Sequence, residues 1–219
     1  MPAHTRSLSI LTLCLVLALC ACSRRPRSTA EVPRSLPAAF AVSVAPFTQP
    51  RNASQLIAGR IPENQGRITP EDMEALNLQL RHILTAESKR QYTFITEQEL
   101  PADATAFHSS EQPQGLPRWI AYGKKKGAHY LLVPQVLDWH QREGSKAGVT
   151  NAAHVRVEFF LLRVDEGEVA SRSVYDEQQV GLADNLLNMG TFIKRRGQWV
   201  TAEQLAAEGM RKAVKDIGL

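Results

Sequence analysis

Two side chains with catalytic and metal-binding potential stand close together in the tripeptide Asp138-Trp139-His140. In a β-strand, residues two positions apart point to the same face, so this spacing would place a carboxylate beside an imidazole. Such a pair suits acid–base catalysis or metal binding when further polar groups join it. The other histidines are scattered along the sequence, at His4, His82, His108, His129 and His154. With no second cluster to meet the pair, we interpret it as a polar strand end that leads into a loop over 141–151.

Common active-site signatures are absent from the sequence. It contains no GxxxxGK(S/T) or GxGxxG phosphate motif, no HExxH or CxxC metal motif, and no GxSxG or SxxK nucleophile motif. The basic run from Gly123 to Gly127 indicates the end of a helix and not a phosphate cradle. We therefore expect no enzyme activity, no cofactor and no metal ion.

The cysteines offer a more definite chemistry, because all three lie within the first 22 residues. Arg6 precedes the apolar run Leu8–Leu19, which is shorter than the roughly 20 residues needed to cross a bilayer. A run of this length is typical of the core of a signal peptide. We predict a secretion signal over residues 1–21, with an ordinary signal peptide or an uncleaved anchor as the alternative to a lipoprotein signal.

The sequence Leu19-Cys20-Ala21-Cys22 resembles the bacterial lipobox, in which a small residue precedes a cysteine that receives diacylglycerol on its sulfur. Cys22 follows the small Ala21, whereas Cys20 follows the larger Leu19, so lipidation is expected at Cys22. Several acyl chains, at about 0.8 kcal/mol per buried methylene, would hold the protein on a membrane. By resemblance to diderm lipoproteins, Ser23 after the cysteine implies the periplasmic face of the outer membrane.

Cleavage before Cys22 would leave the mature protein with one thiol, which excludes a disulfide framework and a cysteine zinc site. The whole chain has a formal charge of +4, and its positive charge is concentrated near the start, with four arginines between residues 23 and 40. The rest is nearly neutral, which argues against a nucleic-acid-binding surface.

The composition divides the chain into three segments. These are the signal peptide 1–21, the lipidated cysteine with a flexible tether over 22–40, and one periplasmic domain over 41–219. Short apolar runs predict strands at Ala41–Phe47, Tyr92–Ile95, His129–Asp138, Ala152–Val164 and Glu168–Val180. Apolar stripes and capping residues predict helices from Thr69, over Pro117–Lys126, over Ala183–Lys194 and from Thr201.

The order of these elements, β-α-β-α-β-β-β-α-α, indicates an α/β (α+β) fold with a mixed sheet of about five strands and packed helices. A hairpin is expected at Asp165-Glu166-Gly167, because a glycine in a short polar joint favours a tight turn. Pro134 predicts a bulge or an edge in the third strand, since proline cannot donate to the sheet ladder.

Two segments are candidates for partner binding. Thr48–Ile68 has no regular pattern, yet it contains the apolar residues Leu56, Ile57 and Ile61. Leu182–Val200 combines an apolar face that includes Phe192 with a basic cluster and Trp199, a pattern of membrane-surface or partner helices. The alternative is that the first segment packs on its own domain and the second on the sheet.

Three stretches carry a family resemblance: Val42–Phe47, Gly127–Val133 and the hairpin Val164–Val169. Together they resemble a periplasmic α/β domain found in the Tol-system translocation protein B, the curli secretion channel lipoprotein and the lipoprotein activator of a peptidoglycan synthase. The C-terminal part is similar to uncharacterised lipoproteins of delta-proteobacterial type. The resemblance implies action through protein contacts, and no catalytic residue carries over.

The leading hypothesis is a membrane-anchored periplasmic accessory protein that binds envelope proteins without catalysing a reaction. The first alternative is a subunit of an oligomeric outer-membrane secretion pore of the curli-channel type. Such a pore needs strands with one apolar and one polar face, whereas both alternating sets of Val155–Val164 contain apolar residues. The second alternative, a cell-wall hydrolase, lacks a recognisable catalytic constellation. The oligomeric state is left open.

Overall fold

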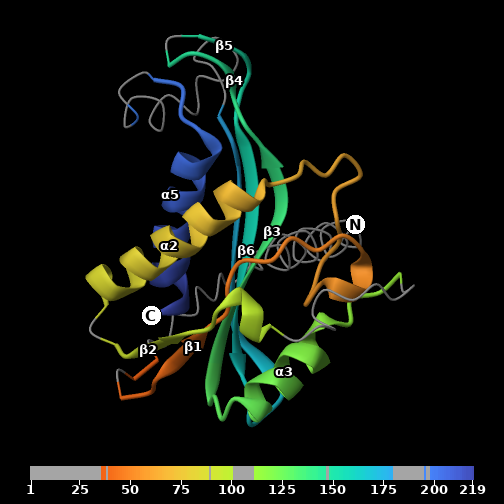
Figure 1. Cartoon of the computed structure of the whole chain (residues 1–219), viewed down its shortest axis with the longest axis vertical. Coiled ribbons are helices and arrows are strands. Elements are labelled where there is room, and N and C mark those ends of the chain that lie inside the picture. Colours follow the sequence, from red (N-terminus) through yellow and green to blue (C-terminus); the bar gives the residue numbers. More distant parts are fainter. Residues whose placement is uncertain are drawn as a thin grey trace, which may run out of the picture. The chain divides into compact units, whose positions relative to one another are not determined.

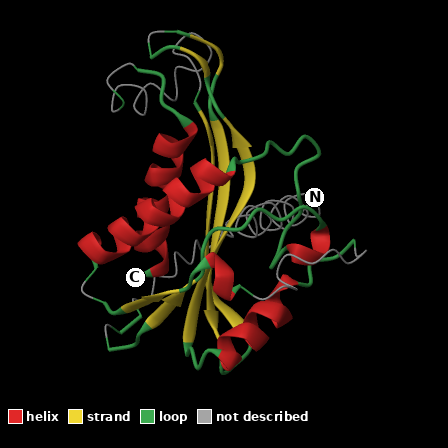
Figure 2. Ribbon diagram, in the orientation of Figure 1, coloured by secondary structure: helices red, strands yellow, loops and turns green. Residues whose placement is uncertain are grey.

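The computed structural model describes residues 36–37, 39–88, 90–100, 111–146, 148–179, 195 and 198–219. They form a five-stranded mixed sheet in the order β2-β1-β3-β6-β7, with helices on both faces (Figures 1 and 2). The strands are β1 (Val42–Val44), β2 (Tyr92–Phe94), β3 (Tyr130–His140), β6 (His154–Arg163) and β7 (Glu168–Gln178). The expected α/β class and five-stranded sheet are confirmed.

The sheet has a parallel and an antiparallel half. β1 pairs in parallel with both β2 and β3, whereas β3, β6 and β7 pair antiparallel. The predicted hairpin joins β6 to β7, and Gly167 supplies the positive φ of 73° that this turn requires. A second small hairpin, β4 (Glu143–Gly144) with β5 (Val149–Asn151), lies within the segment that the sequence predicts as a loop.

Pro134 lies in the central strand β3, paired with Phe159 of β6. On the opposite side of β3 from β6, the pairing with β1 stops before Pro134. β1 ends at Val44, which pairs with Leu132, and beyond it a single isolated bridge joins Thr48 to Gln135. The backbone N–H groups of Ala45 and Thr48 donate to the carbonyls of Leu132 and Pro134. The missing donor of Pro134 therefore falls where the ladder is already interrupted, and the register shift comes later in β3, between Val136 and Asp138.

In the described part of the chain, three α-helices pack on the sheet: α2 (Pro70–Glu87), α3 (Gly115–Lys125) and α5 (Ala202–Ile217). Thr69 caps α2 by accepting from the N–H of Asp72 at 3.1 Å, and Thr201 and Gln204 form a capping box at the start of α5. Both predicted helix starts are thus confirmed. The helix predicted over Ala183–Lys194 lies outside the described residues.

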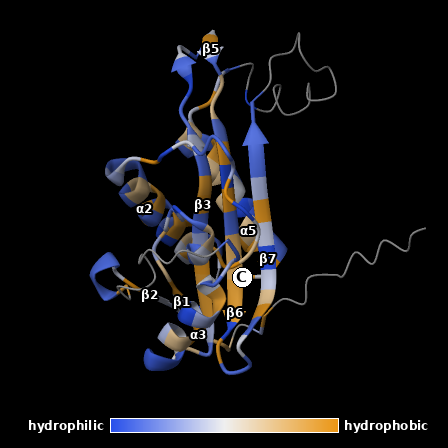
Figure 3. Ribbon diagram, turned by 90° about the vertical axis from the view of Figure 1, so that its right-hand side faces the viewer, coloured by the Kyte–Doolittle hydropathy of each residue, from blue (hydrophilic) through white to orange (hydrophobic). Residues whose placement is uncertain are grey.

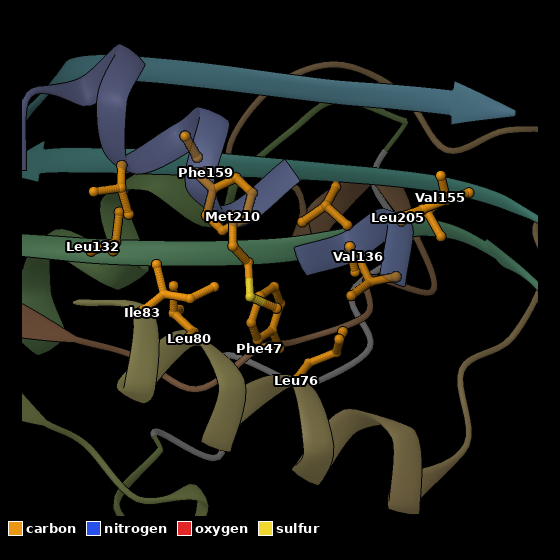
Figure 4. Packing of buried hydrophobic residues seen from close by; sticks show 14 of the residues in the cluster. Phe47, Leu76, Leu80, Ile83, Leu132, Val136, Val155, Phe159, Leu205 and Met210 are labelled. Carbon is orange, nitrogen blue, oxygen red and sulfur yellow. The ribbon is translucent and has the colours of Figure 1, made fainter. Parts of the chain in front are cut away.

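Helices α2 and α5 cover one face of the sheet. Their buried residues Leu76, Ile83 and Met210 meet Val136 of β3 and Phe159 of β6 in one continuous core (Figure 4). The apolar residues of α2 recur at spacings of three and four, which places them on one face of the helix, and this face lies against the core.

The opposite face has a second core, in which Trp119 and Ile120 of α3 pack on Phe160 and Leu162 of β6. β6 is therefore buried on both faces, as its two apolar sets predict. Long hydrophobic stretches run along β3 and β6, whereas the edge strand β7 alternates between hydrophilic and hydrophobic residues (Figure 3).

The side chain of Arg90 holds the segment that precedes β1, and this contact is called the Arg90 clamp. Its guanidinium donates to the carbonyls of Pro37 at 2.7 Å and Phe40 at 2.9 Å, and also to that of Leu36. The ring of Phe40 makes an edge contact with that of Tyr130, at 5.5 Å between centroids. The segment that leads into β1 therefore lies beside Tyr130, the first residue of β3. Among the described residues, no helix is both long and apolar enough to traverse a membrane.

Candidate functional site

The far end of β3 joins three polar side chains, Asp138, His140 and His154. The antiparallel register pairs His140 directly with His154 of β6. Asp138 lies between them: Oδ1 is 3.1 Å from His140 Nε2 and Oδ2 is 3.1 Å from His154 Nδ1. The imidazole rings stack almost in parallel, with centroids 6.1 Å apart. One ligand atom from each residue lies within 4.8 Å of the other two.

The loop over 48–68 holds the carboxylate of Asp138 in place. Asp138 is only 4% exposed, and Oδ1 accepts hydrogen bonds from the N–H groups of Gly66 at 2.6 Å and Trp139 at 3.1 Å. Gln65 ties the loop to β3 by donating to the carbonyl of Leu137 at 2.8 Å. A side chain at residue 66 would put its Cβ 2.2 Å from the carbonyl oxygen of Trp139, so only glycine allows this approach.

Further charged groups continue from this cluster along β6 and β7. His154 Nε2 lies 2.9 Å from Asp176 Oδ1, and Arg156 Nη1 lies 3.7 Å from Asp176 Oδ2. Arg156 also contacts Glu158, whose side chain has no exposed surface. Arg172 of β7 is the last member of this row of charges, with a contact of 2.6 Å to the carboxylate of Glu158. The result is a line of alternating charges on the face opposite α2 and α5.

The expectation that the histidines stay scattered is wrong for His140 and His154. It fails because it considers each histidine within its own strand and leaves out the antiparallel pairing of β3 with β6. A signal was available: two predicted strands separated by the segment 141–151 favour a hairpin, and such a hairpin brings His140 opposite a residue near 154. The interpretation as a simple polar strand end therefore gives way to a three-residue cluster.

The residues proposed for partner binding have different positions. Leu56 is 0% and Ile57 6% exposed, so both side chains pack inside the domain, as the alternative for this loop predicts. Ile61 and Trp199 are half-buried, and the N–H of Trp199 donates to the carbonyl of Lys146 at 3.0 Å. Phe192 lies outside the described residues. The side chains of Leu56 and Ile57 are thus covered almost completely by the domain itself.

A groove of about 440 Å³ lies where α2 passes the carboxyl ends of β1 and β2. In open α/β sheets this end of the parallel strands is where ligands bind. Backbone and side chains from three distant segments line it: Val44–Pro46, part of α2 between Pro70 and Arg81, and Phe94–Gln98. The sequence did not indicate this groove, because only the pairing of β1 with β2 brings the segments together.

The groove has an apolar rim residue among acidic neighbours. Leu78 is 61% exposed, the largest exposed fraction among the large hydrophobic side chains of the described residues. Glu71, Glu74 and Glu97 are exposed around it, while the guanidinium of Arg81 lies 4.2 Å above the ring of Phe94. The rim therefore combines three carboxylates with one cation.

Asn77 is one of the residues that line the groove. Its Oδ1 accepts a hydrogen bond of 2.7 Å from the N–H of Phe47, which fixes α2 to the segment that follows β1. Its amide also donates to Glu97 at 3.4 Å.

No model of a known protein family matches the chain, and no curated protein matches it. The chain is similar in structure to PelC from Paraburkholderia phytofirmans, described as a dodecamer, with a TM-score of 0.47 and 15% identity over 84% of this chain and 90% of that one. It is also similar to the LpoB C-terminal domain from Salmonella enterica, with a TM-score of 0.34 and 15% identity over 64% and 83%. A third likeness is to lipoprotein GNA1162 from Neisseria meningitidis, with a TM-score of 0.37 and 10% identity over 72% and 93%. All three TM-scores lie below 0.5.

Proposed function

We propose that this chain is a lipid-anchored periplasmic accessory protein that binds an envelope protein through the groove beside α2, without catalysing a reaction. The anchor is Cys22, and the membrane is the outer membrane. The observation that supports binding most directly is the groove itself, whose lining includes Val44, Leu80 and the exposed Leu78. Covering the exposed Leu78 side chain with an apolar side chain of a partner would remove apolar surface from water, which favours association.

Charge complementarity indicates the chemistry of the partner. The carboxylates of Glu71, Glu74 and Glu97 line the groove, and Arg81, the cation among the described lining residues, lies over the ring of Phe94. A partner segment with an apolar side chain flanked by lysine or arginine would bury the first in the groove and pair the second with the rim. We therefore propose a basic, extended segment of an envelope protein as the ligand.

Site-specific photo-crosslinking in cells tests the groove. A photoreactive phenylalanine analogue at Leu78 should form an adduct with one envelope protein, because this side chain would lie in the interface. The same analogue at Ala86, exposed on α2 away from the groove, is the matched control and should give no such adduct.

Charge reversal separates a specific contact from chance capture. Replacing Glu74 and Glu97 by lysine should abolish the adduct at Leu78, whereas Glu63→Lys, on the loop away from the groove, should leave it intact. An adduct that is equally strong at both crosslinker positions, or that survives the reversal at Glu74 and Glu97, would refute the groove as the binding site.

Metabolic labelling with a fatty acid tests the anchor independently of the groove. The wild-type chain and Cys20→Ser should incorporate label, whereas Cys22→Ser should not, since only Cys22 follows a small residue. Loss of label in Cys20→Ser instead would move the anchor to the other cysteine, and absence of label in every variant would overturn the lipoprotein assignment.

A further inference from the structure

We propose that Asp138, His140 and His154 form a binding site for Zn²⁺. The inference goes beyond the proposed partner binding and does not depend on it, because the cluster and the groove share no residue. It rests on the spacing of the three ligand atoms, on the groups that orient them and on the exposure of the two imidazoles.

The spacing fits the first coordination shell of zinc. Zinc binds histidine nitrogen and carboxylate oxygen at about 2.0–2.2 Å, which puts two ligands of a tetrahedral shell roughly 3.3 Å apart. Oδ1 of Asp138 lies 3.1 Å from His140 Nε2 and Oδ2 lies 3.1 Å from His154 Nδ1, and one ligand atom from each of the three residues lies within 4.8 Å of the other two. Zinc binding would require side-chain rotations that bring both nitrogens and one carboxylate oxygen to the separation of a shared coordination shell.

The surrounding groups are those that support metal ligands in proteins. A histidine that binds a metal through one nitrogen usually donates its other N–H to a carboxylate. His154 meets this condition, because its Nε2 lies 2.9 Å from Asp176 Oδ1 while Nδ1 faces Asp138. Arg156 in turn contacts Asp176. A carboxylate that binds a metal is usually hydrogen-bonded as well. Asp138 meets this condition, because the N–H groups of Gly66 and Trp139 donate to it.

Two nitrogen donors and one oxygen donor select the kind of ion. Ca²⁺ and Mg²⁺ prefer shells made of oxygen, whereas imidazole favours zinc and its neighbours among the transition metals. Three protein ligands leave the fourth position of a tetrahedral zinc ion for water or another ligand. Access is open, since the side chains of His140 and His154 are 47% and 27% exposed while that of Asp138 is 6% exposed.

Zinc titration of the full chain tests the site. The protein is purified in mild detergent, dialysed against a chelator and titrated with Zn²⁺ alone against a competing dye. We expect one zinc ion per chain, with affinity reduced at least tenfold in His140→Ala and in His154→Ala. Asp176→Asn should weaken binding by roughly ten- to a hundredfold, as loss of an outer-shell partner does at other zinc sites. Co²⁺ in place of zinc should give the visible absorption of a four-coordinate site.

The control is a histidine–carboxylate pair elsewhere in the same protein. His129 Nδ1 lies 2.8 Å from Asp165 Oδ2, and both side chains are largely exposed, so His129→Ala removes the same residue type from a two-residue pair. This variant should bind zinc like the wild type. Circular dichroism without metal should show that His140→Ala is folded, because that imidazole is half exposed.

Two results would overturn the proposal. One is the absence of saturable zinc binding to the folded full chain, which would leave the cluster as a hydrogen-bonded strand end. The other is zinc binding that survives replacement of both His140 and His154, or that falls equally in His129→Ala, which would place the metal elsewhere.

Discussion

Arg172 on β7 reaches across to Glu158 on β6, and its Nη2 lies 2.6 Å from a carboxylate oxygen that has no exposed surface. A second contact, from Arg172 Nε to the same oxygen at 3.1 Å, makes the guanidinium the principal partner of this buried charge. The guanidinium also lies 5.4 Å from the centre of the Phe160 ring. A charge buried in a sheet is costly unless it is paired, so this contact has a direct consequence for stability.

Arg172→Ala should lower the free energy of unfolding by about 2 kcal/mol. Removing one partner of a buried pair typically costs about 3–5 kcal/mol, and the remaining contact of Arg156 with Glu158 at 3.3 Å reduces that loss. Urea denaturation measures it. Arg163→Ala is the control, because Arg163 pairs with the exposed Glu166 and Glu168 and its loss should change stability little. Equal effects of the two variants would contradict the role of burial.

Gly66→Ala should destabilise the protein by at least about 1–3 kcal/mol, the usual cost of forcing extra volume into a packed region. The new Cβ would meet the backbone carbonyl of Trp139 at 2.2 Å, and backbone cannot rotate away as a side chain can. Thermal unfolding measures the effect. Gly148→Ala, where a Cβ meets nothing within 4 Å, should be neutral. A neutral Gly66→Ala would show that the loop does not approach β3 as described.

The contact of Glu99 with Lys126 should make stability depend on acid pH. The ammonium of Lys126, with the backbone and hydroxyl of Thr96, lowers the pKa of Glu99 from 4.5 to about 2. A lowered pKa in the folded state means that the stabilisation is complete above pH 4.5 and is lost as the pH falls towards 2. Glu99→Gln should therefore flatten the dependence of unfolding free energy on pH in that interval.

Lys126→Met should flatten the same interval, because Lys126 is the largest cause of the lowered pKa. Both groups are exposed, so salt should screen the effect in the wild type. A pH dependence that persists unchanged in Lys126→Met would assign the titration to another carboxylate.

Ser23→Asp should redirect the protein from the outer to the inner membrane, if sorting follows the residue after the lipidated cysteine as in the lipoproteins that Cys22 and its neighbours resemble. Density-gradient separation of the two membranes measures the distribution in a diderm host. Ser28→Asp adds the same charge five residues further on and should leave the protein in the outer membrane. Identical distributions of the two variants would contradict sorting by residue 23.

Periodicity and capping were sufficient to predict most of the fold. The stripe of α2 and the caps Thr69 and Thr201 are local signals, and each depends on residues within a few positions of one another. The predicted strands also lie where expected, because apolar runs identify them without knowledge of their partners. The missed hairpin of β4 and β5 has short, polar strands, for which such runs give no signal.

The hairpin pairing of β3 with β6 could be inferred from the sequence, but the meeting of the three side chains around Asp138 also depends on the position of a bulge in β3. In the first half of β3, Leu132 and Val136 face α2 and α5, so strict alternation would turn Asp138 to that apolar core as well. The register shift between Val136 and Asp138 reverses the alternation and turns Asp138 to the face of His154. One extra residue in the strand therefore decides whether the three side chains meet.

The clamp of Arg90 on Leu36, Pro37 and Phe40 has a mechanical consequence in the anchored protein that we propose. Tension on the N-terminal segment would load three hydrogen bonds to one guanidinium before it reached β1. Residues 36–40, once released, could span at most about 16 Å, at about 3.3 Å per extended residue, so the tether would lengthen by less than that while the sheet stayed intact. The hydrogen bonds of Arg90 would then break before those of the sheet when the tether is pulled.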